Sequence, residues 1–220
     1  MLLIPFIIYS LACLKLTNKC RNLGITWLLF MFFVCIGISF MMVQLLYTQQ
    51  AIILLKNSFL GTVVLFSLLL VLSGIGSIYT NGLSNWKNKL FFILILIPLY
   101  NLLLPHMIAS ARPAVANSSI YFKTIILSAF IFPLGLLLGV FFPLGFLLSN
   151  QLEPKISFSW LYSMDILGSI VGILVGISLP IKIGYRNSIY CLSCLLLIQV
   201  ILVFWLRWLS LIDKRAEERI

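Results

Sequence analysis

Six runs of predominantly apolar residues, each long enough to cross a lipid bilayer as a helix, follow one another along this chain. A bilayer core about 30 Å thick requires about 20 apolar residues in a helix. Because lipid offers no hydrogen bonds to the backbone, such a run is expected to be helical throughout. The runs predict membrane spans near 26–46, 59–80, 90–108, 121–148, 159–181 and 188–209.

The composition agrees with a membrane protein and excludes a soluble globule. Hydrophobic residues make up 62% of the 220 residues and charged residues only 9%, which is more apolar surface than a soluble domain of this length can bury. The polar stretches between the runs are too short to fold independently. We therefore expect one all-α membrane domain over 1–220, a polytopic helix bundle in the lipid bilayer, with a charged cytoplasmic tail at 211–220.

A seventh candidate span covers residues 2–15, "LLIPFIIYSLACLK". It is shorter than a usual span, although tilt or local thinning of the bilayer would let it cross. A cleavable signal peptide needs positive charge ahead of its apolar run, and the first basic residue here is Lys15. A lipoprotein site at Cys13 is disfavoured because Ser10 stands where a large aliphatic residue is expected. The bundle is thus expected to have six or seven helices.

Lysine and arginine residues are distributed unevenly between the two ends of the expected bundle. Ten lie on the side of the 15–25 loop and five on the other, which favours a cytoplasmic loop and a cytoplasmic C-terminus. We expect a multi-pass protein of a cell membrane, the bacterial inner membrane. Its net charge of +10 is explained by cytoplasmic retention and anionic lipid, so nucleic acid is not an expected partner.

Small residues recur at helical spacing in two of the runs. Gly168, Gly172 and Gly176 fall every fourth residue, which places them on one helix face and lets a neighbouring backbone approach closely. The segment "SGIGS" supplies four more small residues, Ser73, Gly74, Gly76 and Ser77. Close helix contact is the expected role of both groups.

The run at 121–148 contains two prolines ten residues apart, Pro133 and Pro143. Each removes a backbone hydrogen bond and bends a helix. A bent or partly broken helix is therefore expected. Broken helices line binding sites in some transporters, but bends in packed bundles are commoner.

Asp165 is the one acidic residue inside an expected span. It lies about six residues into its helix, roughly 9 Å from the start, where the helix dipole favours negative charge. Ser169 follows one turn later, and the expected topology lets Ser73 or Ser77 reach it from the span at 59–80. Either the carboxyl group holds helix ends together by hydrogen bonds, or it binds a cation or relays protons.

The other polar residues show no pattern that indicates catalysis, a cofactor or a metal ion. Gln44 and Thr48 share a helix face, which predicts either interhelical hydrogen bonds or the lining of a polar cavity. Cys191 and Cys194 form a CxxC within an apolar run, where thiols act as small hydrophobic groups. We therefore predict no catalytic residue, no cofactor-binding residue and no metal ligand.

Three segments occur in the order seen in a known membrane region. They are "GISFMMVQLLYTQQAIILLKNSFLGTVVLFSLLLVLSGIGS" at 37–77, "PLGLLLGVFFPLGF" at 133–146 and "WLYSMDILGSIVGILVG" at 160–176. Over roughly 27–205 the chain resembles the C-terminal transmembrane part of the bacterial spermidine synthase-like membrane proteins. The resemblance implies a membrane module that accompanies a soluble Rossmann-type, aminopropyltransferase-like domain, and no such domain occurs in this sequence.

The chain also departs from that family. Gln44 stands where the family tends to have an acid, and Lys56, Asn57 and Ser58 replace its usual Gly-His-Pro. Asp165 stands where the family usually has an asparagine, which hydrogen-bonds but does not titrate. The resemblance therefore favours the structural interpretation of Asp165.

Three functions are compatible with these features. The first is a non-catalytic membrane subunit that anchors or cooperates with a separately encoded soluble partner, such as a Rossmann-type aminopropyltransferase-like protein. The second is a small transporter or channel subunit for a cationic or lipidic substrate. The third is a structural membrane protein of a larger assembly, or a degenerate remnant. Each of the three allows homo- or hetero-oligomers.

Overall fold

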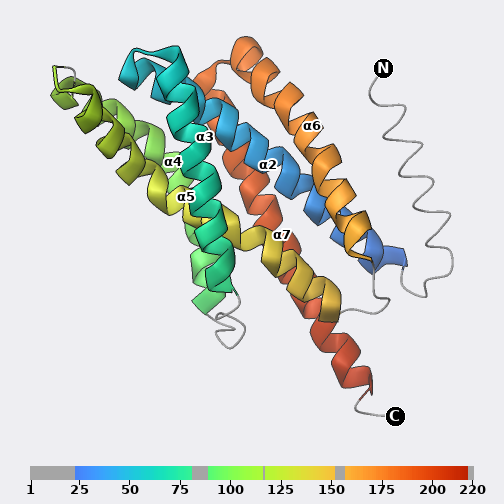
Figure 1. Ribbon diagram of the computed structural model, residues 1–220. Helices are drawn as coiled ribbons and strands as arrows, with labels where there is room; N and C mark the ends of the chain where they lie inside the picture. The colour runs from blue at the N-terminus through green and yellow to red at the C-terminus, as the bar shows by residue number, and fades with distance from the viewer. Residues whose placement is uncertain (1–22, 81–88, 116, 152–156, 218–220) are drawn as a thin grey trace.

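The computed structural model describes residues 23–80, 89–115, 117–151 and 157–217, and within these ranges it contains six helices and no strand (Figure 1). The helices are α2 (Leu23–Leu55), α3 (Ser58–Thr80), α4 (Lys89–Val115), α5 (Ile120–Gln151), α6 (Phe158–Ile183) and α7 (Tyr185–Glu217). All six are long and apolar enough to cross a membrane. The prediction of an all-α membrane bundle is thereby confirmed, whereas the candidate span at 2–15 lies outside the described residues.

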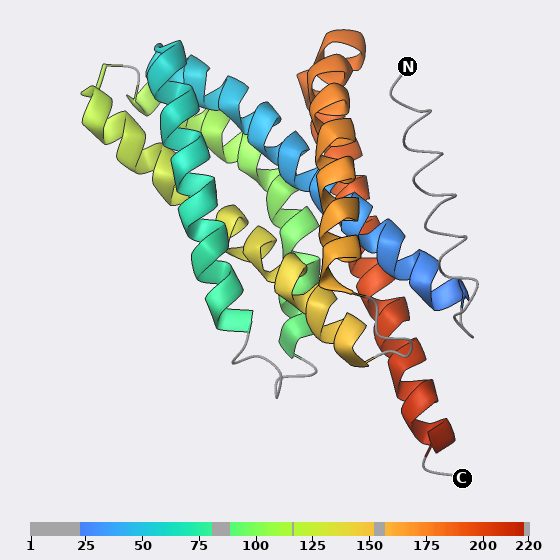
Figure 2. The same ribbon diagram turned by 45° about the vertical axis from the view of Figure 1, so that its right-hand side comes forward.

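Helix α2 forms the centre of the bundle. It packs against α3, α5, α6 and α7, and its longest contact is with α6. Its side chains Phe32, Phe33 and Tyr47 are among the largest that are fully buried. The other long contact joins α3 to α5, and α3 and α6 lie on opposite sides of α2 (Figures 1 and 2).

Helices α2, α4 and α7 extend well beyond the predicted spans, and α4 continues past 108 to Val115. Helix α2 continues past 46 to Leu55. The Thr48 hydroxyl within this extension is satisfied by its own helix, because it donates to the Gln44 carbonyl at 2.6 Å. Lys56, at a φ of 54°, ends the helical path. Helix α7 runs to Glu217, so most of the predicted tail at 211–220 is helical, which agrees with the helix propensity of its lysine, arginine and glutamate residues.

Helix α5 is continuous from Ile120 to Gln151 and contains both Pro133 and Pro143. Its path changes direction near the middle (Figure 1), which agrees with a bent helix and not with a broken one. Helix α4 likewise continues through three prolines, Pro98, Pro105 and Pro113. Each proline removes one backbone donor, and the flanking helical hydrogen bonds hold the remaining turns.

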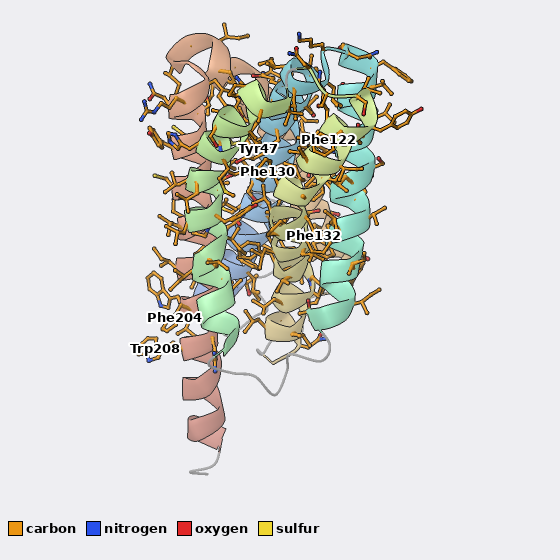
Figure 3. All side chains as sticks on the ribbon, turned by 90° about the vertical axis from the view of Figure 1, so that its left-hand side faces the viewer. Tyr47, Phe122, Phe130, Phe132, Phe204 and Trp208 are labelled. Carbon is orange, nitrogen blue, oxygen red and sulfur yellow. The ribbon has the colours of Figure 1, made fainter. Side chains whose placement is uncertain are left out.

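Large apolar side chains cover much of the outer surface. Phe204 and Trp208 project from the side of α7 (Figure 3), and each exposes about half of its surface. Exposed apolar area on this scale is unsuited to water and suited to lipid. It agrees with the multi-pass membrane assignment.

Candidate functional site

A cavity of about 310 Å³ lies between helices α2, α3, α5 and α6. We call it the Asp165 cavity. Its lining residues are Ile36 and Phe40 from α2, Leu70, Ser73, Gly74 and Ser77 from α3, Leu138, Gly139 and Phe142 from α5, and Asp165 and Ser169 from α6. The structure thus brings Asp165 and Ser169 together with the two serines of "SGIGS".

Close contact between α2 and α6 fixes the position of Asp165. A Cβ atom on Gly37 would lie 2.1 Å from the Asp165 carbonyl oxygen, and one on Gly168 would lie 2.2 Å from the Val34 carbonyl oxygen. Gly172 and Gly176 continue the same buried face against α2. The α6 backbone therefore rests directly on that of α2, as the glycine spacing predicts, and no larger residue fits at the contact.

The opposite wall is fixed by a similar contact between α3 and α5. A Cβ atom on Gly139 would lie 2.1 Å from the Ser73 carbonyl oxygen, and one on Gly76 would lie 2.1 Å from the Leu136 carbonyl oxygen. Gly74 differs from its neighbours, because it is exposed and a Cβ atom there would meet nothing within 4 Å. The prediction of a helix contact at Gly74 is wrong, since this residue borders the cavity.

The Asp165 side chain is half-buried, and it makes no hydrogen bond or ion pair with any residue that the structure describes. The Ser73 hydroxyl donates to the Leu70 carbonyl of its own helix at 3.0 Å. The structure therefore does not support the interpretation that Asp165 holds helix ends together by hydrogen bonds. An unpaired carboxylate is unfavourable in apolar surroundings unless a cation, a proton or water compensates it.

Aromatic rings lie beside the cavity where α5 ends and α6 begins. Phe142 lines the cavity and meets Phe33 and Phe146 at ring-centre distances of 5.7 and 5.0 Å. Phe146 in turn stacks on Phe158 at 4.4 Å, and Tyr162 lies 6.4 Å from Phe142. The face of an aromatic ring attracts cations, so the cavity combines a carboxylate with an aromatic wall.

No protein-family model, curated protein or solved structure matches this chain. The resemblance to the spermidine synthase-like membrane proteins therefore stays a prediction. The candidate site is defined by its geometry alone.

Hydrogen bonds between helices occur elsewhere, at residues that the sequence analysis did not single out. Fully buried Asn101 of α4 accepts a bond from the Tyr47 hydroxyl at 2.8 Å and donates to the Ser193 hydroxyl at 2.7 Å. Asn101 thereby joins α2, α4 and α7. It is the lone amide in the apolar segment "ILIPLYNLLLP", which is the signal that could have identified it.

A second polar contact joins α7 to α2. The buried Gln199 amide donates to the Ser39 hydroxyl at 2.7 Å and also to the Cys35 carbonyl oxygen. Its own carbonyl oxygen is buried and has no partner in the described part of the chain. Together with Asn101, Gln199 performs the structural role that the sequence suggested for Asp165.

The remaining predicted site residues do not line the cavity. Gln44 is buried, but its side chain forms no hydrogen bond to the described residues, so neither predicted role of Gln44 is observed. Pro133 and Pro143 flank the α5 segment that lines the cavity without lining it themselves.

Proposed function

We propose that this chain is a small membrane transporter, or a transport subunit, that binds an organic cation or the cationic head of a lipid-soluble molecule in the Asp165 cavity. The observation that carries the proposal is a carboxylate without a described partner on the wall of a cavity. A bound cation would provide the missing counter-charge. This function belongs to the same class as the transporter alternative drawn from the sequence.

The lining favours an organic cation over a bare metal ion. Besides Asp165, the cavity offers the hydroxyl groups of Ser73, Ser77 and Ser169 and the rings of Phe40 and Phe142. One carboxylate and neutral hydroxyls supply too few charged oxygen ligands for a divalent metal ion. An ammonium group would instead pair with the carboxylate while its carbon atoms contact the aromatic and aliphatic walls.

The cavity is reached from the side of the bundle. Its lining residues Leu70 and Gly74 on α3 are exposed. On α6, Ile166 and Ile170 beside Asp165 and Ser169 are exposed as well. Because α3 and α6 each pack on α2 and form no extensive contact with each other (Figure 2), an amphipathic molecule could enter from the lipid.

Binding of benzyltrimethylammonium to the purified chain tests the proposal. Thermal unfolding in mild detergent, measured over a range of concentrations of this probe, gives an apparent affinity. We expect Asp165→Asn to weaken that affinity about tenfold or more, which corresponds to about 1.4 kcal/mol of lost charge interaction. Uptake of the labelled probe into proteoliposomes would then separate transport from binding alone.

Ser163→Ala provides a matched control on the same helix. The Ser163 hydroxyl donates only to the Ser159 carbonyl of its own helix at 2.8 Å, so this variant should bind the probe as the wild type does. Equal affinity of the wild type and Asp165→Asn would refute the proposal. Equal weakening in both variants would refute it too, because the effect would then not depend on the carboxylate.

The membrane-subunit function remains a second proposal. The C-terminal end of α7 extends beyond the other helices (Figure 3) and carries the charged sequence "DKRAE", which could contact a soluble partner. Affinity purification from the native membrane in mild detergent, followed by mass spectrometry, would test it. A stoichiometric soluble protein would support this function, and loss of every soluble partner would count against it.

A further inference from the structure

Basic residues gather at one end of the bundle. Helices α2, α4 and α6 end there and α3, α5 and α7 begin there, and these turns carry Lys56, Arg112, Lys123, Lys182 and Arg186. The acidic residues in the described ranges lie toward the opposite end: Asp165 near the start of α6, and Asp213 and Glu217 in the last turns of α7. We call this end the basic end.

Arg112 is the more buried of the two arginines in this group. Its guanidinium group is half-buried and donates from Nη2 to the side-chain carbonyl of Gln50, which is itself only 6% exposed. The Nε atom of Arg112 is buried and has no hydrogen-bond partner within the described ranges. A neutral amide acceptor leaves the positive charge uncompensated, which is costly for a partly buried cation.

Tyr185 supplies a second unsatisfied group at the same place. It lies beside Gln50 and Arg112. Its buried hydroxyl nevertheless has no hydrogen-bond partner among the described residues. Arginine Nε can only donate, and a tyrosine hydroxyl can donate as well. Because a tyrosine hydroxyl can also accept, the need for a negatively charged acceptor comes from Arg112, whose buried Nε–H has no partner and whose charge meets only the Gln50 amide in the described ranges. The Tyr185 hydroxyl can donate to the same acceptor.

We propose that Arg112, Tyr185 and Gln50 form a binding site for a phosphate group at the basic end of the bundle. A phosphate offers several acceptor oxygens, so it can take bonds from Arg112 and Tyr185 together, and arginine binds phosphate particularly well. Arg112 lies three residues before the end of α4 at Val115, which is the depth of lipid headgroups. The phosphate can therefore belong to a phospholipid or be free in solution.

Thermal unfolding of the full chain, purified and delipidated in a neutral detergent, tests the site. The probes are phosphatidylglycerol, sodium phosphate, and sodium chloride at matched ionic strength. We expect phosphatidylglycerol, phosphate or both to raise the unfolding temperature more than chloride does. Protection by phosphate alone would identify a soluble ligand, and protection by the lipid alone would identify a headgroup. Absence of protection by either would overturn the proposal.

Three variants distinguish the site from general attraction to positive charge. Arg112→Gln should raise the half-effective probe concentration about tenfold, because a charge-assisted bond is lost, and Tyr185→Phe should raise it about threefold. Arg186→Gln is the control, since Arg186 is exposed and its Nε donates to the Tyr190 hydroxyl at 2.9 Å. Equal effects of Arg112→Gln and Arg186→Gln would overturn the proposal. If Arg112→Gln does not fold, an unchanged value for Tyr185→Phe would overturn it instead.

This site is independent of the Asp165 cavity. The two sites share no lining residue, since the cavity involves α3, α5 and α6 with α2, whereas Gln50, Arg112 and Tyr185 come from α2, α4 and α7. Asp165→Asn should therefore leave phosphate protection unchanged. Failure of either proposal would not imply failure of the other.

Discussion

Replacing Gly168 by alanine should push the α6 backbone away from the α2 backbone. In the present packing the new Cβ atom would lie 2.2 Å from the Val34 carbonyl oxygen and 2.9 Å from the Val34 Cα and carbonyl carbon atoms. Close contacts between carbon and carbonyl oxygen in proteins are about 3.3–3.6 Å. The two backbones would have to move apart by about 1 Å, and neither atom group belongs to a flexible side chain that could move aside alone.

The expected cost follows from two opposing effects. Overpacking of a tight contact costs about 1–3 kcal/mol, and a backbone clash along the longest helix contact of the bundle belongs at the upper end of that range. Alanine regains about 1 kcal/mol over glycine inside a helix. The net destabilisation is about 2 kcal/mol, which lowers the unfolding temperature of a chain of this size by about 4–8 °C.

Gly74→Ala is the matched comparison. Gly74 is also a glycine inside an apolar helix, but its added Cβ atom would meet nothing within 4 Å. The variant should gain up to about 1 kcal/mol of helix propensity and unfold at the same or a higher temperature than the wild type. Thermal unfolding in detergent, followed by size-exclusion chromatography or circular dichroism, measures both. Equal stability of the two variants would refute the packing argument.

Two further predictions concern the polar groups within the bundle. Asn101→Leu should destabilise the chain by about 1–2 kcal/mol, because the Tyr47 hydroxyl keeps only the backbone carbonyl of Asn101 at 3.2 Å and loses the side-chain acceptor at 2.8 Å, while the Ser193 hydroxyl loses its donor. Gln199→Leu should cost less, since that amide already has an unpartnered carbonyl oxygen. Chemical or thermal unfolding that ranks the two variants in the reverse order would contradict this. Asp165→Leu should leave the unfolding temperature of the ligand-free chain unchanged or raise it, because no hydrogen bond to a described residue is lost and an unpaired charge is removed. A fall of several degrees would restore the structural interpretation of Asp165.

Much of the architecture could be predicted because it depends on quantities that sequence records directly. The number of apolar residues in a run determines whether it can cross a bilayer, and all six predicted spans begin within three residues of the helix start. The spacing of Gly168, Gly172 and Gly176 determines one face of α6 without reference to a partner. Helical topology alone placed Ser73 and Ser77 at the same depth as Asp165.

The rest could not be predicted because the membrane removes the usual guide to helix rotation. In a soluble bundle the polar face of a helix marks its outer side, but here lipid and core both select apolar side chains. The sequence therefore did not show that Asn101 and Gln199 face the core, or that Gly74 and Gly76, two residues apart, have different surroundings. It also gave no sign that Arg112 would meet Gln50, which is 62 residues away.

The backbone contacts at Gly37, Gly76, Gly139 and Gly168 also bear on how this chain can change through evolution. Where two backbones touch, even an added methyl group must push them apart, so these few positions should tolerate almost no substitution. The lipid-facing positions between them need only remain apolar, and they can exchange leucine, isoleucine, valine and phenylalanine freely. Distant relatives should thus share the spacing of their small residues even where most of the surrounding residues have been substituted.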